Sequence, residues 1–253
     1  IKSLYKCMSK LTIILPAAGK GTRLNLPYPK EILRLDNDNA LIDNCFNFFR
    51  DYGRKDVEFV VVINEHKLEL INYLAKYKDK FNISFTFQNP NELEYTGAIK
   101  SARHLFGEYN IVMLPDTLMK LKPNEDLYTL VQNSLLETGF TFLYKKEHNA
   151  DILKTKGALY VSPENTIIDY QDKPQEDLTT FNAFWCAFAF RKRTFDVCMN
   201  FMEKSTLNLK TNQREIEQTP IFGSKGIEVL DYIDLGTWPE IRRMILDYEN
   251  NNN

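Results

Sequence analysis

The residues best suited to chemistry lie in one short segment, LPAAGKGTRLNLPYPK, which begins at the last residue of an apolar run. Gly19 and Gly21 let the backbone approach a ligand closely, and successive N–H groups in such a loop can form a cradle for an anion. Arg23 carries a planar guanidinium that fits phosphate oxygens, Thr22 can add a hydroxyl, and Lys30 adds a positive charge. The segment therefore predicts a phosphate-binding loop.

Two better-known phosphate loops do not fit this spacing. A P-loop needs G-x-x-x-x-G-K-[ST], whereas this chain has GKGT after two alanines. A dinucleotide-binding loop needs a third glycine where Leu24 stands, and an acidic residue where Asn64 follows FVVVI. The remaining pattern is G-x-G-T-R followed by P-K, and its alternative explanation is a solvated turn with incidental cations.

The cysteines and histidines do not indicate a metal site. No two cysteines form a C-x-x-C pair, and no histidine has a second His or Cys at ligand spacing. Widely spaced cysteines are typical of reduced, buried thiols in a cytoplasmic protein, which is the location we expect. The residues concerned are Cys7, Cys45, Cys186, Cys198, His66, His104 and His148.

Composition limits the partners of this chain. Its 253 residues are 43% hydrophobic and 26% charged, with a net charge of −2, which is ordinary for a globular protein with a core. Such a balance gives no field for a nucleic acid polymer, so any anion must be bound locally. No apolar run reaches membrane-spanning length, and the first one is too short for a secretory signal, so we expect no membrane partner.

The elements that must position the loop follow a regular pattern. Short β-branched runs alternate with helical patterns in the first half of the chain, which predicts an α/β fold with a doubly wound, mostly parallel central sheet. The expected strands are 11–15, 59–63, 82–87 and 109–114, and the expected helices are 41–52, 66–81 and 96–106.

The second half has a different texture. Closely spaced strand-like runs predict a mixed sheet extension with hairpins, continuous with the first half in one domain, 1–253. The expected strands are 139–145, 156–162, 165–173, 181–190 and 227–233, and the expected helices are 193–203 and 239–249.

Ligands of such sheets bind at the carboxyl ends of the strands. The glycine-rich loop follows the first strand, and Asp116 directly follows YNIVML and a proline. We therefore expect the loop and this carboxylate to lie at the same edge of the sheet.

Further motifs follow the loop in a fixed order. They are Gln88, TGA at 96–98, Asp116, Gly157, DKP at 172–174 and DLGT at 234–237. Together with LPAAGKGTRL and PK, they resemble the motifs of the sugar-1-phosphate nucleotidylyltransferase family, whose members include pyrophosphorylases and cytidylyltransferases. The resemblance covers most of the chain. It implies a Rossmann-like nucleotidyltransferase fold, with a nucleotide-binding half at about 9–135 and an acceptor-binding half at about 136–245.

The resemblance also implies roles for individual residues. Two carboxylates would bind Mg²⁺, and three cationic side chains would act on the phosphates. One further set of residues would contact the nucleotide and another the acceptor. The metal ligands would be Asp116 and Asp234, and the catalytic residues Arg23, Lys30 and Lys173. The nucleotide-binding residues would be Ala17, Ala18, Gly19, Lys20, Gly21, Thr22, Gln88, Thr96 and Gly97, and the acceptor-binding residues Gly157, Asp172, Asn182 and Trp185.

In this family, an acceptor phosphate attacks the α-phosphorus of a nucleoside triphosphate and pyrophosphate leaves. By the resemblance, Arg23 would hold the β- and γ-phosphates, Lys30 would lie near the α-phosphate, and Lys173 would orient the acceptor phosphate. Such a reaction depends on positioning and charge stabilisation. A phosphate dianion needs no general base, which agrees with the lack of a candidate catalytic histidine.

Departures from the family bear on the substrates. Lys30 follows Arg23 by seven positions, a short span that resembles the uridylyl- and cytidylyltransferase branches and favours CTP or UTP over dTTP. The family's E-K-P is D-K-P here, and its Thr and Gly in N-x-A-x-T-G are Cys186 and Ala187, beside Trp185. We therefore expect CTP and a small phosphorylated acceptor, with L-glutamine phosphate for capsular phosphoramidate favoured. Choline phosphate or an ordinary sugar 1-phosphate is the alternative.

Two other functions are less consistent with the motifs. A catalytically silent nucleotide-binding regulator need not keep Arg23, Lys30 and both aspartates. A glycosyltransferase would usually carry D-x-D, whereas Asp116 is followed by Thr117 and Leu118. The sequence does not determine the oligomeric state, and a homo-oligomer is one of the states consistent with it.

Overall fold

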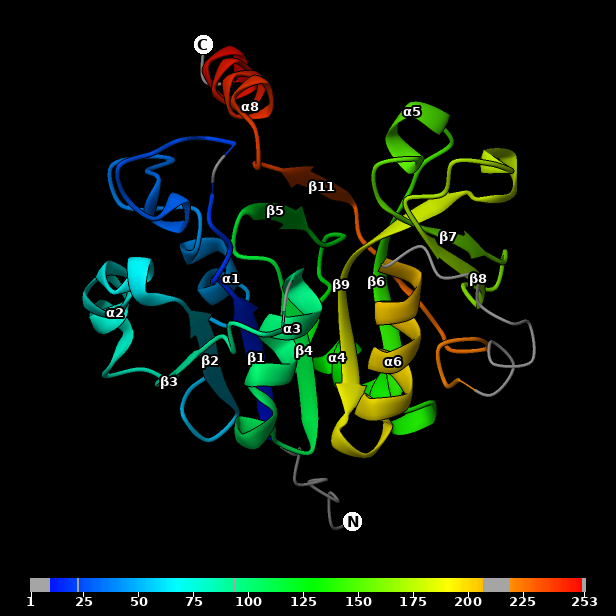
Figure 1. The fold of residues 1–253 in the computed structure, drawn as a ribbon, viewed down its shortest axis with the longest axis horizontal. Coiled ribbons are helices and arrows are strands. Elements are labelled where there is room, and N and C mark those ends of the chain that lie inside the picture. The colour runs from blue at the N-terminus through cyan, green and yellow to red at the C-terminus, as the bar shows by residue number, and fades with distance from the viewer. Residues whose placement is uncertain (1–9, 22, 93, 207–218, 252–253) are drawn as a thin grey trace.

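A large sheet organises the molecule (Figure 1). The computed structural model describes residues 10–21, 23–92, 94–206 and 219–251. Its strands are β1 Leu11–Pro16, β2 Val57–Ile63, β3 Asn82–Phe87, β4 Tyr109–Met113, β5 Thr117–Lys120, β6 Phe140–Lys146, β7 Gly157–Val161, β8 Ile167–Asp172, β9 Ala183–Arg191, β10 Ile227–Glu228 and β11 Asp231–Asp234.

The nine-stranded sheet has the order β10-β6-β9-β4-β1-β2-β3, and β7 and β8 extend it from β9. β1 pairs in parallel with both β2 and β4, and β2 pairs in parallel with β3. β9 runs antiparallel to both β4 and β6. A separate antiparallel pair joins β11 to β5. The predicted fold class, a mostly parallel sheet with a mixed extension, is confirmed.

Helices cover both faces of this sheet. Buried residues of α1, α2 and α4 belong to the hydrophobic cluster on one face, and those of α3 and α6 to the cluster on the other. The helices are α1 Asp43–Asn47, α2 Glu69–Leu74, α3 Glu94–Ser101, α4 Leu127–Glu137, α5 Ala150–Leu153, α6 Phe195–Thr206 and α8 Trp238–Asn251, with a 3₁₀ turn, η1, at Lys30–Ile32.

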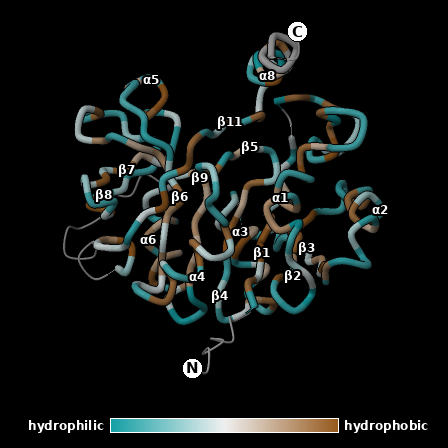
Figure 2. Tube along the Cα trace, turned by 180° about the vertical axis from the view of Figure 1, so that it is seen from behind, coloured by the Kyte–Doolittle hydropathy of each residue, from teal (hydrophilic) through white to brown (hydrophobic). Residues whose placement is uncertain are grey.

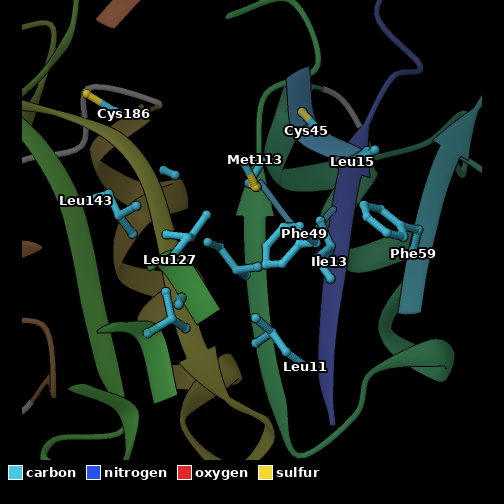
Figure 3. Close-up of a cluster of buried hydrophobic side chains, with 14 of the residues drawn as sticks. Leu11, Ile13, Leu15, Cys45, Phe49, Phe59, Met113, Leu127, Leu143 and Cys186 are labelled. Carbon is cyan, nitrogen blue, oxygen red and sulfur yellow. The ribbon is translucent and has the colours of Figure 1, made fainter. Parts of the chain in front are cut away.

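The central strand β1 shows why the first apolar run forms a strand here. Leu11, Ile13 and Leu15 belong to the first cluster, while Ile14 packs into the cluster on the opposite face. A strand buried on both faces gains from an apolar residue at almost every position, so its sequence is a continuous apolar run. Figure 3 shows the first cluster around β1. In Figure 2, hydrophobic stretches follow the central strands, while many residues of the peripheral loops are hydrophilic.

The expected strands agree with the structure to within about two residues, apart from the last one. The predicted strand 227–233 is in fact two strands, because the chain changes partner in the middle. Val229 donates its N–H to the Tyr144 carbonyl at 2.8 Å, and the next residue, Leu230, donates to the Lys120 carbonyl at 2.8 Å. β10 therefore belongs to the main sheet and β11 to the small one.

The helix predictions were too long in the first half. The predicted helix 66–81 is a 3₁₀ turn at Glu65–Lys67, then α2, then a second 3₁₀ turn at Ala75–Tyr77. The Asn64 side chain accepts from the His66 N–H at 2.9 Å and so caps the first turn. Within 41–52 only α1 is a regular α-helix. The sequence interpretation also missed β5, α4 and α5.

The thiol prediction is confirmed for the described cysteines. Cys45, Cys186 and Cys198 are free and buried, and Cys7 lies outside the described residues. Among the helices that the structure describes, none combines the length and the apolar character that crossing a membrane requires.

Candidate active site

Backbone pairing brings the two predicted metal-binding aspartates to one edge. Asp116 lies between β4 and β5, and Asp234 is the last residue of β11. In the β5–β11 ladder, Asp234 lies opposite Thr117, and the Leu235 N–H donates to the Asp116 carbonyl at 3.0 Å. The two residues are 118 positions apart in sequence, so this small antiparallel pair is what makes them neighbours.

Lys30 contacts the first of these carboxylates. Its Nζ forms an ion pair with Asp116 Oδ2, and both side chains are about 85% buried. A second ion pair fixes the turn η1 that carries Lys30. The next residue, Glu31, is buried and accepts a hydrogen bond from Lys67 Nζ at 2.6 Å. Lys30, the lysine of the P-K motif, is therefore held at the carboxyl edge of the sheet by its ion pair with Asp116.

Lys156 contacts the second carboxylate. Its Nζ lies 2.6 Å from Asp234 Oδ2, and the Gly236 N–H donates to Asp234 Oδ1 at 3.0 Å. Burial acts to raise the pKa of Asp234, but Lys156, the Gly236 N–H and Arg23 outweigh it, and the pKa lies below its ordinary value. The sequence interpretation missed Lys156, although it directly precedes the predicted acceptor glycine.

The glycine-rich loop lies beside this pair. Gly21 has a left-handed backbone with φ of 65°, and nothing lies within 4 Å of the Cβ position at Gly19. The guanidinium of Arg23 lies 3.5 Å from the Cβ position at Gly236, next to Asp234. Lys20 is exposed, and Thr22 lies outside the described residues.

The two alanines that precede the loop are packed. Ala17 and Ala18 are buried, and the Ala17 N–H donates to the Val62 carbonyl at 2.8 Å. The Asn64 side chain donates to the Ala18 carbonyl at 2.5 Å. Asn64 is the residue that stands where a dinucleotide-binding protein has its acidic residue, and here it holds the loop to β2.

Three of the predicted nucleotide-binding residues, Gln88, Thr96 and Gly97, lie at the start of α3 and the turn before it. The Gln88 amide donates to the Glu92 carbonyl at 2.7 Å and to the Glu94 carbonyl at 3.1 Å. A Cβ on Gly97 would lie 2.3 Å from the Glu92 carbonyl oxygen, so the close packing of α3 against this turn requires glycine. Thr96 is buried beside it. Gln88 therefore ties down the turn that leads into α3, the helix that carries Thr96 and Gly97.

The predicted acceptor residues gather where β7, β8 and β9 meet. Gly157 pairs with Asp172 across β7 and β8, and a Cβ on Gly157 would lie 1.9 Å from Trp185 Nε1. Lys173, with a left-handed φ of 46°, follows Asp172 and is exposed. Asn182 differs from the other residues, because its side chain bonds both the N–H and the carbonyl of Val161, at 2.9 and 2.8 Å.

We expect Gly157→Ala to destabilise the fold by about 1–3 kcal/mol, the usual cost of overpacking, because the new methyl group overlaps the Trp185 indole. Urea denaturation would measure the change. Gly53→Ala is the matched control, since nothing lies within 4 Å of its Cβ position. Trp185→Leu in the Gly157→Ala background should recover stability, and equal losses in the two glycine variants would contradict the close contact.

The fold and this arrangement define a class of α/β protein that carries a glycine-rich cationic loop after its first strand and two carboxylates at the neighbouring strand ends. The family model described as Nucleotidyl transferase matches residues 11–251. The chain belongs to this family and is a nucleotidyltransferase enzyme.

Solved structures support the fold. The chain is similar to an apo UDP-glucose pyrophosphorylase, with a TM-score of 0.77 and 18% identity over 97% of this chain and 100% of that one. A UDP-glucose pyrophosphorylase from Acinetobacter baumannii gives 0.72 and 18%, over 95% and 93%. A glucose-1-phosphate thymidylyltransferase, described as putative, from Bacillus anthracis gives 0.71 and 15%, over 94% of each chain. No curated protein matches the sequence.

Proposed function

We propose that this enzyme transfers a CMP or UMP group from the nucleoside triphosphate to a small phosphorylated acceptor and releases pyrophosphate. CTP with L-glutamine phosphate, for capsule modification, is the favoured pair. One observation carries the proposal: two lysine–aspartate pairs, Lys30–Asp116 and Lys156–Asp234, lie beside the glycine-rich loop at the carboxyl edge of the sheet.

The arrangement suits transfer at a phosphorus atom between two polyanions. The loop and Arg23 would hold the β- and γ-phosphates, and Lys30 would stabilise charge that develops at the α-phosphate. Lys173 and Lys156, which are joined by a backbone hydrogen bond of 2.9 Å, would act on the acceptor phosphate. The acceptor phosphate would attack the α-phosphorus, the bond to the bridging oxygen would break, and pyrophosphate would leave with that bonding pair.

The carboxylates also fit Mg²⁺. Asp116 and Asp234 offer two hard oxygen ligands. Among the described residues, no group of three or more His, Cys, Asp or Glu side chains is placed to hold a metal ion. Mg²⁺ in nucleotide sites is commonly held by one or two carboxylates, with phosphate oxygens and water completing its octahedron. When bound, it would neutralise phosphate charge. Lys30 and Lys156 occupy these carboxylates here, so we infer that the metal enters together with the nucleotide.

The choice of CTP or UTP rests on the seven-position span from Arg23 to Lys30. The choice of a non-sugar acceptor rests on Asp172, Trp185, Cys186 and Ala187. A sugar 1-phosphate is the second candidate, because the similar structures are named for UDP-glucose and glucose 1-phosphate. One of them is named as UTP-bound.

A screen for pyrophosphate release tests the proposal. CTP, UTP, dTTP and GTP are each combined with L-glutamine phosphate, choline phosphate or glucose 1-phosphate, in the presence of Mg²⁺. We expect turnover with CTP or UTP and loss of that turnover on addition of a chelator. A folded sample that turns over no pair would rule the proposal out.

A further inference from the structure

The acceptor end of the site contains a buried carboxylate that lacks a cation. Asp172 is 6% exposed. Within the described ranges, its carboxylate forms no ion pair and accepts no hydrogen bond; its backbone N–H has a partner, the Ser205 hydroxyl at 2.8 Å. A carboxylate at this depth is costly unless an opposite charge reaches it. A cation supplied by a ligand would therefore stabilise this carboxylate.

The surrounding charges leave this cost in place. Burial raises the pKa of Asp172, Lys173 partly opposes the rise, and Glu94 adds to it. Lys173 is exposed and follows Asp172 in a left-handed conformation, without an ion pair to it. The buried carboxylate of Asp172 and the exposed one of Glu94 thus both contribute negative charge to this region.

Aromatic rings border this carboxylate. Asp172 lies opposite Gly157, and Trp185 covers Gly157. The Trp185 ring lies 5.7 Å from the Tyr95 ring, and both side chains are partly exposed. In the described structure, the buried Trp185 Nε1 has no hydrogen-bond partner. A carboxylate beside aromatic faces is a combination that binds ammonium groups.

Three nearby residues that precede or belong to β9 offer little to a sugar hydroxyl. The Asn182 amide is occupied by Val161 at both of its polar ends. Cys186 and Ala187 are buried, and neither offers a hydroxyl. A hexose would leave Asp172 without a counter-charge.

We propose, on the basis of the function proposed above, that the acceptor carries an ammonium group as well as its phosphate, and that Asp172 binds this ammonium beside the aromatic pair of Tyr95 and Trp185. The ligand class is a small phosphorylated amine, primary or quaternary. Lys173 and Lys156 bind its phosphate, so the two ends of the ligand meet opposite charges.

Equilibrium binding tests the proposal with two ligands of the same shape. Choline phosphate carries a quaternary ammonium, and 3,3-dimethylbutyl phosphate replaces that nitrogen with carbon. Titration calorimetry in the presence of a non-hydrolysable CTP analogue and Mg²⁺ should show choline phosphate binding about tenfold or more tightly than its neutral isostere. Asp172→Asn should abolish the difference, while the exposed Asp177→Asn should preserve it.

Further arms identify the amine. Tighter binding of L-glutamine phosphate or ethanolamine phosphate than of choline phosphate would assign a primary ammonium, and the reverse order a quaternary one. Equal binding of choline phosphate and its isostere, or preferred binding of glucose 1-phosphate, would overturn the proposal. Turnover of glucose 1-phosphate alone would overturn it and leave the reaction class intact. Ammonium binding without any pyrophosphate release would refute the proposed function alone.

A stability measurement keeps the Asp172→Asn result interpretable. Burial raises the pKa of Asp172, so the ionised group destabilises the fold above that pKa, and this penalty fades as the pH falls toward the ordinary value. Asp172→Asn should therefore melt at or above the wild-type temperature at pH 7.5, with the gap closing in acid. A lower melting temperature would show a structural role for Asp172 and overturn the proposal.

Discussion

Lys30→Ala is expected to lower kcat by about 10²–10³-fold, the usual cost of removing one preorganised group that stabilises transition-state charge. The position of Lys30 is fixed on both sides. Its Nζ pairs with Asp116, and the residue after it is anchored by a buried ion pair. The loss should fall on kcat more than on KM, because Arg23 and the loop still hold the outer phosphates.

The measurement is steady-state pyrophosphate release at saturating nucleotide and acceptor. Lys55→Ala is the matched control and should keep wild-type rates. Lys55 is exposed and lies just before β2, at the amino end of that strand and so at the edge of the sheet opposite the site. Lys30→Arg should recover part of the activity. A Lys30→Ala enzyme with wild-type kcat and unchanged folding would remove Lys30 from the mechanism.

The sequence predicted much of the fold because the local signals agree. β1 to β4 are short apolar runs separated by helical patterns, and a strand buried on both faces needs little else to be recognised. The loop was predictable for the same reason, since its glycines and cations are contiguous. Helix lengths were less predictable, because side chains such as Asn64 divide a continuous helical pattern into 3₁₀ turns.

The pairing of distant residues was not predictable. Lys156 and Asp234 are separated by 78 positions, and they meet because β7 begins where β11 ends. β5 and β11 are four residues each, too short to stand out in sequence, yet they bring Asp116 and Asp234 together. The contact of Trp185 with Gly157 likewise depends on the pairing of β7 with β9, which no local pattern encodes.

The largest effect on stability is expected for Lys67→Met, which should cost about 3–5 kcal/mol because it leaves Glu31 buried without its counter-charge. The Glu31 and Lys67 side chains are 1% and 5% exposed, and their ion pair is 2.6 Å long. Lys78→Met, an exposed lysine after the same helical segment, is the control and should change stability little. Urea denaturation monitored by circular dichroism would measure both variants.

Acid pH should partly rescue Lys67→Met. Burial already raises the pKa of Glu31, and Lys67 opposes that rise, so its loss moves the pKa further upward. A carboxyl group with a raised folded-state pKa binds its proton more readily when folded, so stability increases as the pH falls through that window. The deficit of Lys67→Met should therefore be largest at neutral pH and shrink toward the ordinary Glu value.

The double variant Glu31→Leu, Lys67→Met separates charge from packing. Replacing both partners by apolar side chains removes the unpaired charge, so stability should return close to the wild-type value. Activity is expected to remain lower than wild type if the ion pair also positions the adjacent Lys30, because an apolar pair fixes η1 less strictly. A double variant as unstable as Lys67→Met would show that packing by the lysine stem, rather than charge pairing, stabilises this turn.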